Sequence, residues 1–114
     1  MKIIDHTQDN RKIAELNSEK RLIHNAQDAL DLMGNLYYQG YDVIIIYAHH
    51  LPSDFFELKN GLAGEILQKF SNYRLKLAII GDFKDTSKSF HDFIRESNKG
   101  NHIRFTHSLT QALA

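Results

Sequence analysis

The sequence contains no cysteine, and this absence excludes several kinds of chemistry at once. Without a thiol the chain forms no disulfide, has no cysteine nucleophile and cannot bind zinc through sulfur. A chain without disulfides suits a reducing compartment, so we expect a cytoplasmic location. Residues 1–6 lack the apolar run of a signal peptide, and no apolar run approaches the length of a membrane span, so we expect no membrane partner.

An excess of either charge is missing too. Lys and Arg together number 14, as do Asp and Glu, so the formal net charge is zero. Nucleic-acid-binding domains usually carry a basic excess or a basic stripe, and the balanced charge therefore argues against a nucleic-acid partner. Seven histidines make the charge sensitive to acid, because each can gain a proton at about pH 6 to 7.

Proline and glycine are scarce, and no repeat, low-complexity segment or linker divides the chain. There are one proline and six glycines among 114 residues, with 42% hydrophobic and 25% charged residues. This composition is ordinary for a globular domain, and the length suits one hydrophobic core. We therefore expect a single domain over residues 1–114.

The most apolar stretch, Val43–Ile46, predicts the centre of the fold. It is nearly all β-branched, which suits an interior parallel strand that is covered on both faces. The pattern of the other residues predicts four further strands, at 2–4 and 12–16 around a turn at 8–10, at 75–80 and at 102–106. It also predicts four helices, over 25–39, within 51–73, from Thr86 or Ser87 to Gly100, and a short one after Ser108. Residues 19–23 fit either a strand or the approach to the first helix.

This alternation of strands and helices predicts the α/β class. We expect a mostly parallel sheet of four to five strands, with an antiparallel N-terminal hairpin at its edge and helices packed on it. Each crossover between parallel strands should be right-handed.

The helix after the central strand has the clearest periodicity. Apolar residues recur there at every fourth position, namely Leu58, Leu62, Ile66 and Phe70. Asp54 and Glu57 have the spacing of a capping box, with Ser53 as a competing cap, so the helix is expected to begin near them. Of Phe55 and Phe56, one should pack beneath the helix while the other stays exposed as an anchor for a partner.

Four blocks of the sequence resemble a family of bacterial proteins called domain of unknown function 4180. The blocks are Asn25–Asn35, Gly61–Phe70, Tyr73–Phe83 and Glu96–Asn101. The family name implies no activity, substrate or catalytic residue.

The order of elements is also similar, more distantly, to STAS-type domains, the fold of anti-sigma factor antagonists. In that superfamily the start of the helix after the buried strand is a partner-docking surface, and it often carries a phosphorylatable Ser or Thr. The comparable stretch here, Phe55–Leu62, holds no Ser or Thr near Asn60, and Ser53 lies seven residues earlier. The resemblance therefore implies docking at this helix start and supplies no phosphorylation site there.

Polar residues gather after the carboxyl ends of the predicted strands, where ligands bind in open α/β sheets. They are His49, His50, Asp54, Asp82, Asp85, Lys88 and His107. A metal would need a third ligand beside the two adjacent histidines, and no known metal-binding spacing is present. Lys88 has no Gly-rich loop before it, and no nucleophile elbow surrounds any serine. We expect no metal and no cofactor.

Two hypotheses remain open. In the first, the chain is a regulatory or protein-interaction module rather than an enzyme. It would bind a protein partner, or a second copy of itself as a homodimer, through Asp54, Phe55, Phe56, Lys59 and Asn60. In the second, it is a small-ligand-binding protein or an enzyme that uses the strand-end rim, with His49, Asp54, Asp82 and Lys88 as ligand contacts.

Overall fold

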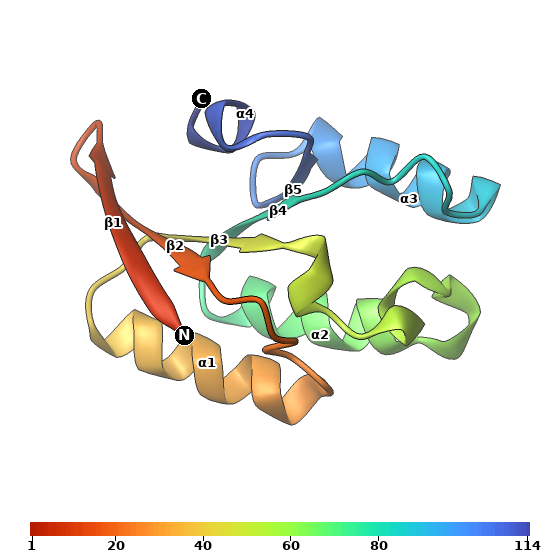
Figure 1. Ribbon diagram of the computed structural model, residues 1–114, viewed down its shortest axis with the longest axis horizontal. Coiled ribbons are helices and arrows are strands. Elements are labelled where there is room, and N and C mark those ends of the chain that lie inside the picture. The colour runs from red at the N-terminus through yellow and green to blue at the C-terminus, as the bar shows by residue number, and fades with distance from the viewer.

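Strand β3, Val43–Tyr47, is the middle strand of a five-stranded sheet (Figure 1). The computed structural model describes residues 1–114. The sheet has the order β1-β2-β3-β4-β5, in which the other strands are Lys2–Gln8, Arg11–Asn17, Lys76–Ile80 and Ile103–Thr106. β1 is antiparallel to β2, and all other neighbours are parallel. The predicted α/β class, the mixed sheet and its N-terminal hairpin are confirmed.

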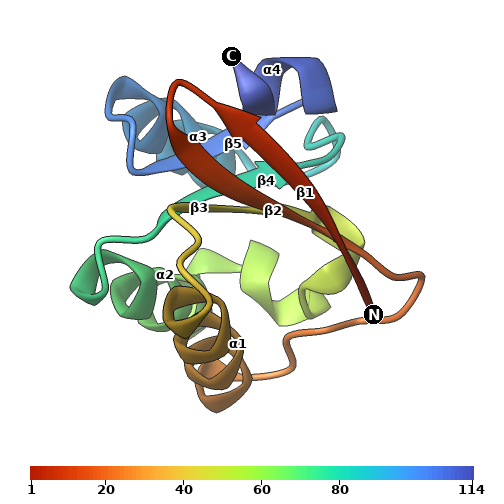
Figure 2. The same ribbon diagram turned by 90° about the vertical axis from the view of Figure 1, so that its left-hand side faces the viewer.

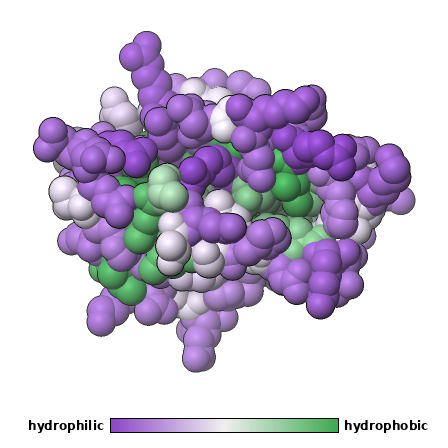
Figure 3. All heavy atoms as spheres, turned by 90° about the horizontal axis from the view of Figure 1, so that it is seen from above, coloured by the Kyte–Doolittle hydropathy of each residue, from purple (hydrophilic) through white to green (hydrophobic).

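The four helices cover the two faces of the sheet unequally. They are α1, Ala26–Tyr38; α2, Leu62–Asn72; α3, Lys88–Lys99; and α4, Leu109–Leu113. The first three contribute to a core of 23 buried residues on one face. On the other face α4 covers a cluster of six, and Figure 2 shows α3 and α4 on opposite sides of β5. Seen from the α4 side, the surface is mostly hydrophilic, with apolar side chains visible in hollows between polar ones (Figure 3).

β3 is buried on both faces, as its uninterrupted apolar sequence predicts. Ile44 and Ile46 belong to the large core, whereas Val43 and Ile45 belong to the small one. Side chains alternate between the faces of a strand, so a strand between two hydrophobic layers needs apolar residues at every position.

Single residues shape the turn between β1 and β2 and the two ends of α1. Asp9 and Asn10 both have positive φ, which is the backbone of a two-residue type I′ hairpin turn between β1 and β2. The Asn25 side chain accepts a hydrogen bond from the backbone N–H of Asp28 and caps α1. Gly40 has a φ of 88°, the left-handed conformation that a glycine adopts most easily after a helix. Residues 19–23 contain no strand.

The predicted start of the helix after β3 is wrong. Three short 3-10 turns, Ala48–His50, Ser53–Phe56 and Leu58–Asn60, precede α2, which begins only at Leu62. Gly61, with a φ of 79°, ends the last turn and separates it from the helix. The left-handed residue breaks the helical path, so the capping-box spacing of Asp54 and Glu57 starts a tight turn instead of a helix.

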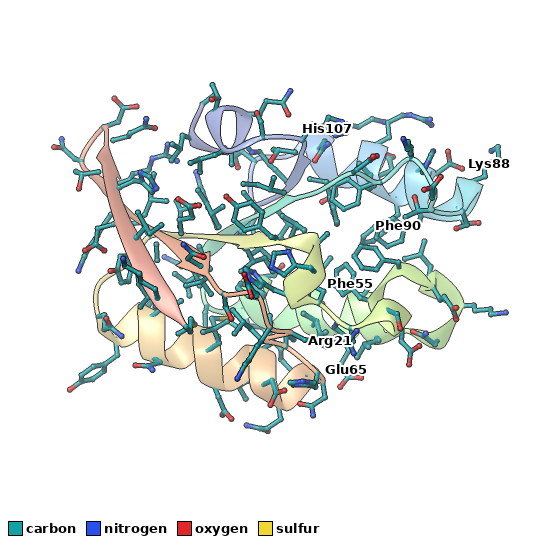
Figure 4. All side chains as sticks on the ribbon, viewed as in Figure 1. Arg21, Phe55, Glu65, Lys88, Phe90 and His107 are labelled. Carbon is teal, nitrogen blue, oxygen red and sulfur yellow. The ribbon has the colours of Figure 1, made fainter.

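A cluster of phenylalanines holds these turns against the rest of the protein. Phe55 is fully buried and packs edge-on against Phe56 and Phe90, with ring centroids 5.2 Å and 6.1 Å away. Figure 4 shows Phe55 and Phe90 side by side in the interior. Six of the seven phenylalanines join this cluster, and the other three are Phe83, Phe93 and Phe105. The turns are therefore anchored by aromatic packing rather than by helical hydrogen bonds.

None of the helices has the length and apolar character needed to cross a bilayer.

Replacing Phe55 tests this anchor. Phe55→Ala should lower the free energy of unfolding by about 3–5 kcal/mol, because it removes a fully buried aromatic side chain and leaves a cavity. Phe56→Ala should cost clearly less, since Phe56 is already partly exposed. Urea unfolding of both variants measures the difference, and equal losses would contradict the described packing.

Candidate functional site

The residues predicted for partner docking lie in the 3-10 turns between β3 and α2. Asp54, Lys59 and Asn60 are exposed, Phe56 is half-buried, and Phe55 is enclosed. The Asn60 side chain donates to the carbonyl of Asp54 and accepts from the backbone N–H of Leu62, both at 3.0 Å. Asn60 thus ties the turn to the first residue of α2, and Phe55 is out of reach of a partner.

An open cleft of about 810 Å³ separates these turns from the segment that leads into α3. We call it the turn cleft. One wall contains Ser53 and residues 56–59, and the other contains residues 85–87 and Ser89. Two residues of the predicted docking set, Phe56 and Lys59, line it. Phe56 and Leu58 are the two hydrophobic side chains among the nine residues that line it, and the other seven are polar or charged.

Hydrogen bonds between near neighbours in the sequence hold the second wall, which contains residues 85–87 and Ser89. The Ser87 hydroxyl accepts from the backbone N–H of Phe90 at 3.1 Å and begins α3, as predicted. Thr86 donates its hydroxyl proton to the carbonyl of Phe83 at 2.6 Å. Both hydroxyls are therefore engaged in holding the segment, and Ser53 and Ser89 remain as exposed hydroxyls of the cleft.

The four residues predicted for the alternative ligand site are not brought together. His49 lines a small hollow beside β2, and Asp82 lines a different hollow with His91 and His107. Asp54 borders neither of them. Lys88 bonds Asp92 at 3.3 Å and extends outward at the far end of α3 (Figure 4). That contact and a second one from Arg95 lower the pKa of Asp92, chiefly through the Lys88 hydrogen bond.

His49 and His50 converge on one backbone oxygen. Their Nε2 atoms lie 2.8 Å and 2.9 Å from the carbonyl of Ser18. The backbone N–H of Tyr47 donates to Nδ1 of His50, so His50 is neutral with its proton on Nε2. His50 is completely buried. Burial lowers its pKa, whereas the Ser18 bond raises it less. The pair fastens the segment after β2 to the end of β3.

A polar cluster that sequence reasoning missed lies beside this pair. Glu15 of β2 is 7% exposed and accepts from the Tyr47 hydroxyl at 2.7 Å, and its other oxygen lies 2.8 Å from Nε2 of His6. Burial and this carboxylate raise the pKa of Tyr47 to about 12, so its hydroxyl keeps its proton and donates. Glu15, Tyr47 and His49 line a hollow of about 170 Å³.

This cluster joins the β1–β2 hairpin to β3, which lies about thirty residues further along the chain. The signal that could have found it is a lone Glu within the apolar run of β2, because a buried carboxylate requires partners. The chain contains no group of three or more His, Asp or Glu side chains arranged to hold a metal ion.

One of three comparisons with known proteins gives a match. A family model described as "Domain of unknown function (DUF4180)" matches residues 8–114. No curated protein and no solved structure matches the chain. The likeness to STAS-type domains therefore stays an expectation.

The environment of His50 predicts a pH dependence of stability. Its folded-state pKa lies below the ordinary value of 6.5, so the unfolded chain takes up the proton first. The contribution of His50 to the free energy of unfolding should be fully present above about pH 6.5. It should be lost as the pH falls toward the folded-state pKa. Urea unfolding of the wild type and of His50→Gln between pH 8 and pH 5 measures it. The stability gap between the two proteins should narrow in acid; a constant gap would contradict a buried neutral ring.

Proposed function

The chain belongs to the family described as "Domain of unknown function (DUF4180)", and we propose that it is a small cytoplasmic protein-interaction module with a regulatory role. Its docking surface is the turn cleft, which holds a segment of a protein partner. The observation that carries the proposal is the half-buried ring of Phe56 in the wall of an open cleft, whose other lining residues are mostly polar or charged.

Phe56 has the properties of an interface anchor. Its ring packs against Phe90 and Phe55 at centroid distances of 5.4 Å and 5.2 Å, so it is held rigidly and loses little side-chain freedom on binding. Its remaining surface faces the cleft beside Leu58. Rigid aromatic side chains surrounded by polar groups carry much of the binding energy in protein interfaces.

The polar groups of the cleft favour a peptide segment over a small metabolite. Lys59, Glu57 and Asp85 are exposed and carry both signs of charge, while Ser53 and Ser89 offer hydroxyls. A small-molecule site usually encloses its ligand with apolar walls and a few convergent polar groups. Here the polar groups are spread along an open channel, which suits hydrogen bonds to an extended chain.

Site-specific crosslinking in native cells tests the docking surface. A photoreactive amino acid in place of Lys59 should capture the partner, whereas the same group in place of Lys20, an exposed residue outside the cleft, should not. Phe56→Ser with Lys59→Glu should weaken the captured complex about thirtyfold, because loss of an anchor costs about 2 kcal/mol. Equal capture from both positions would refute docking at the turn cleft.

A second candidate function is favoured by the cluster of Glu15, Tyr47 and His6. The hollow beside it lies at the carboxyl ends of β2 and β3, the usual position of ligands in open α/β sheets. Its volume of about 170 Å³ admits only a small molecule. The phenol oxygen of Tyr47, whose proton is held by Glu15, and the Glu15 carboxylate would accept hydrogen bonds from a small polar metabolite there.

A thermal-shift screen separates this candidate from the first. A metabolite that binds in the hollow should raise the melting temperature of the wild type by several degrees and that of Tyr47→Phe by much less. Asp82→Ala is the matched control, since Asp82 lines a different hollow, and it should keep the full shift. A shift that is lost in Asp82→Ala and kept in Tyr47→Phe would place the ligand elsewhere.

A further inference from the structure

The outer edge of β1 carries backbone groups that have no partner within the chain. The backbone N–H of Asp42 donates to the carbonyl of Lys12 at 2.8 Å, so Lys12 directs its backbone groups toward β3. Because these groups alternate along a strand, Ile13 and Glu15 direct theirs toward β1. Their partners in the register are His6 and Ile4. The residues of β1 that alternate with them are Ile3, Asp5 and Thr7, and these therefore point their N–H and C=O groups outward.

β1 lacks most of the features that protect a strand edge. It contains no proline and one lysine, and its register with β2 is continuous from Lys2 to Gln8 without a bulge. Figure 2 looks toward this edge of the sheet and shows no helix or loop in front of β1. β1 thus presents a regular row of donors and acceptors over seven residues.

The opposite edge of the sheet is closed by side chains of α3. Asn98 accepts from the backbone N–H of Phe105 at 2.8 Å and donates to its carbonyl at 3.0 Å. The Ser97 hydroxyl donates to the carbonyl of Ile103 at 2.6 Å. Three of the four outward groups of Ile103 and Phe105 are therefore occupied, and a new strand cannot pair with β5 without breaking these bonds.

We propose that β1 pairs with β1 of a second copy of this chain, antiparallel and across a twofold axis at Ile4. The two five-stranded sheets then form one continuous sheet. The occupant of the edge is a second copy because the strand is complementary to itself in this register. In it, Ile3 faces Asp5 of the other copy as a hydrogen-bonded pair, Asp5 faces Ile3, and Thr7 faces Met1.

The other twofold registers fit less well. An axis at Asp5 also satisfies all the outward groups, but it sets two carboxylates directly opposite each other, and like charges in that position destabilise a sheet. An axis at Ile3 sets residues 5–8 beyond the end of β1 of the other copy, and an axis at His6 sets Ile3 opposite the turn residue Asp9. With the axis at Ile4, the two half-buried isoleucines face each other as a non-hydrogen-bonded pair, whose Cα atoms lie about 4.5 Å apart.

Because the chain has no cysteine, a single introduced thiol reports on this axis. In the proposed dimer the two residues at position 4 are within disulfide range, whereas the two residues at position 8 are about 26 Å apart. Ile4→Cys is the test and Gln8→Cys is its matched control, since Gln8 is exposed on the same strand and on the same face.

The wild type should sediment as a concentration-dependent dimer, and mild oxidation should convert Ile4→Cys to a covalent dimer at least tenfold faster than Gln8→Cys. A wild type that stays monomeric up to about 1 mM overturns the proposal. This holds even if a strand of another protein binds the edge, because the proposed occupant is a second copy. A dimer in which the two cysteine variants crosslink at the same rate overturns it as well, because the interface then lies elsewhere. Neither substitution touches the turn cleft, so the outcome is independent of the proposed docking function.

Discussion

Burial of β3 on both faces is the constraint on which the rest of the fold depends. Ile44 and Ile46 need cover on one side, and Val43 and Ile45 need it on the other. The strands follow each other across the sheet in sequence order, and right-handed crossovers that advance in one direction place their helices on the same face. α1, α2 and α3 therefore share one layer, and the short α4 is left to cover the other face.

Much of this architecture could be predicted because each element carries a local signal. The β-branched run of β3, the cap at Asn25 and the glycine at position 40 act through their own neighbours. The start of α2 could not be predicted in the same way. The four-residue spacing from Leu58 to Phe70 fits a helix, but the left-handed Gly61 and the pull of Phe55 into the aromatic cluster override it.

The polar contacts were harder to predict because their partners come from different strands. Glu15 meets His6 and Tyr47 only after three strands have paired, and the carbonyl that joins His49 and His50 belongs to a loop residue. Which of the predicted docking side chains are exposed depends on tertiary packing, and the sequence pattern does not reveal it. The sequence predicted that one of Phe55 and Phe56 would be enclosed, and the packing decides that it is Phe55, while Phe56 is half-buried and borders the turn cleft.

The side-chain clamp of Asn98 on β5 also limits how large an assembly this sheet can build. A strand-edge contact normally repeats, since a sheet with two open edges can add copies without end and grow into a fibre. With one edge occupied by Asn98 and Ser97, the proposed pairing at the other edge would use the one open strand edge of each copy. Loss of both the Asn98 amide and the Ser97 hydroxyl would remove that stop and expose the chain to open-ended polymerisation.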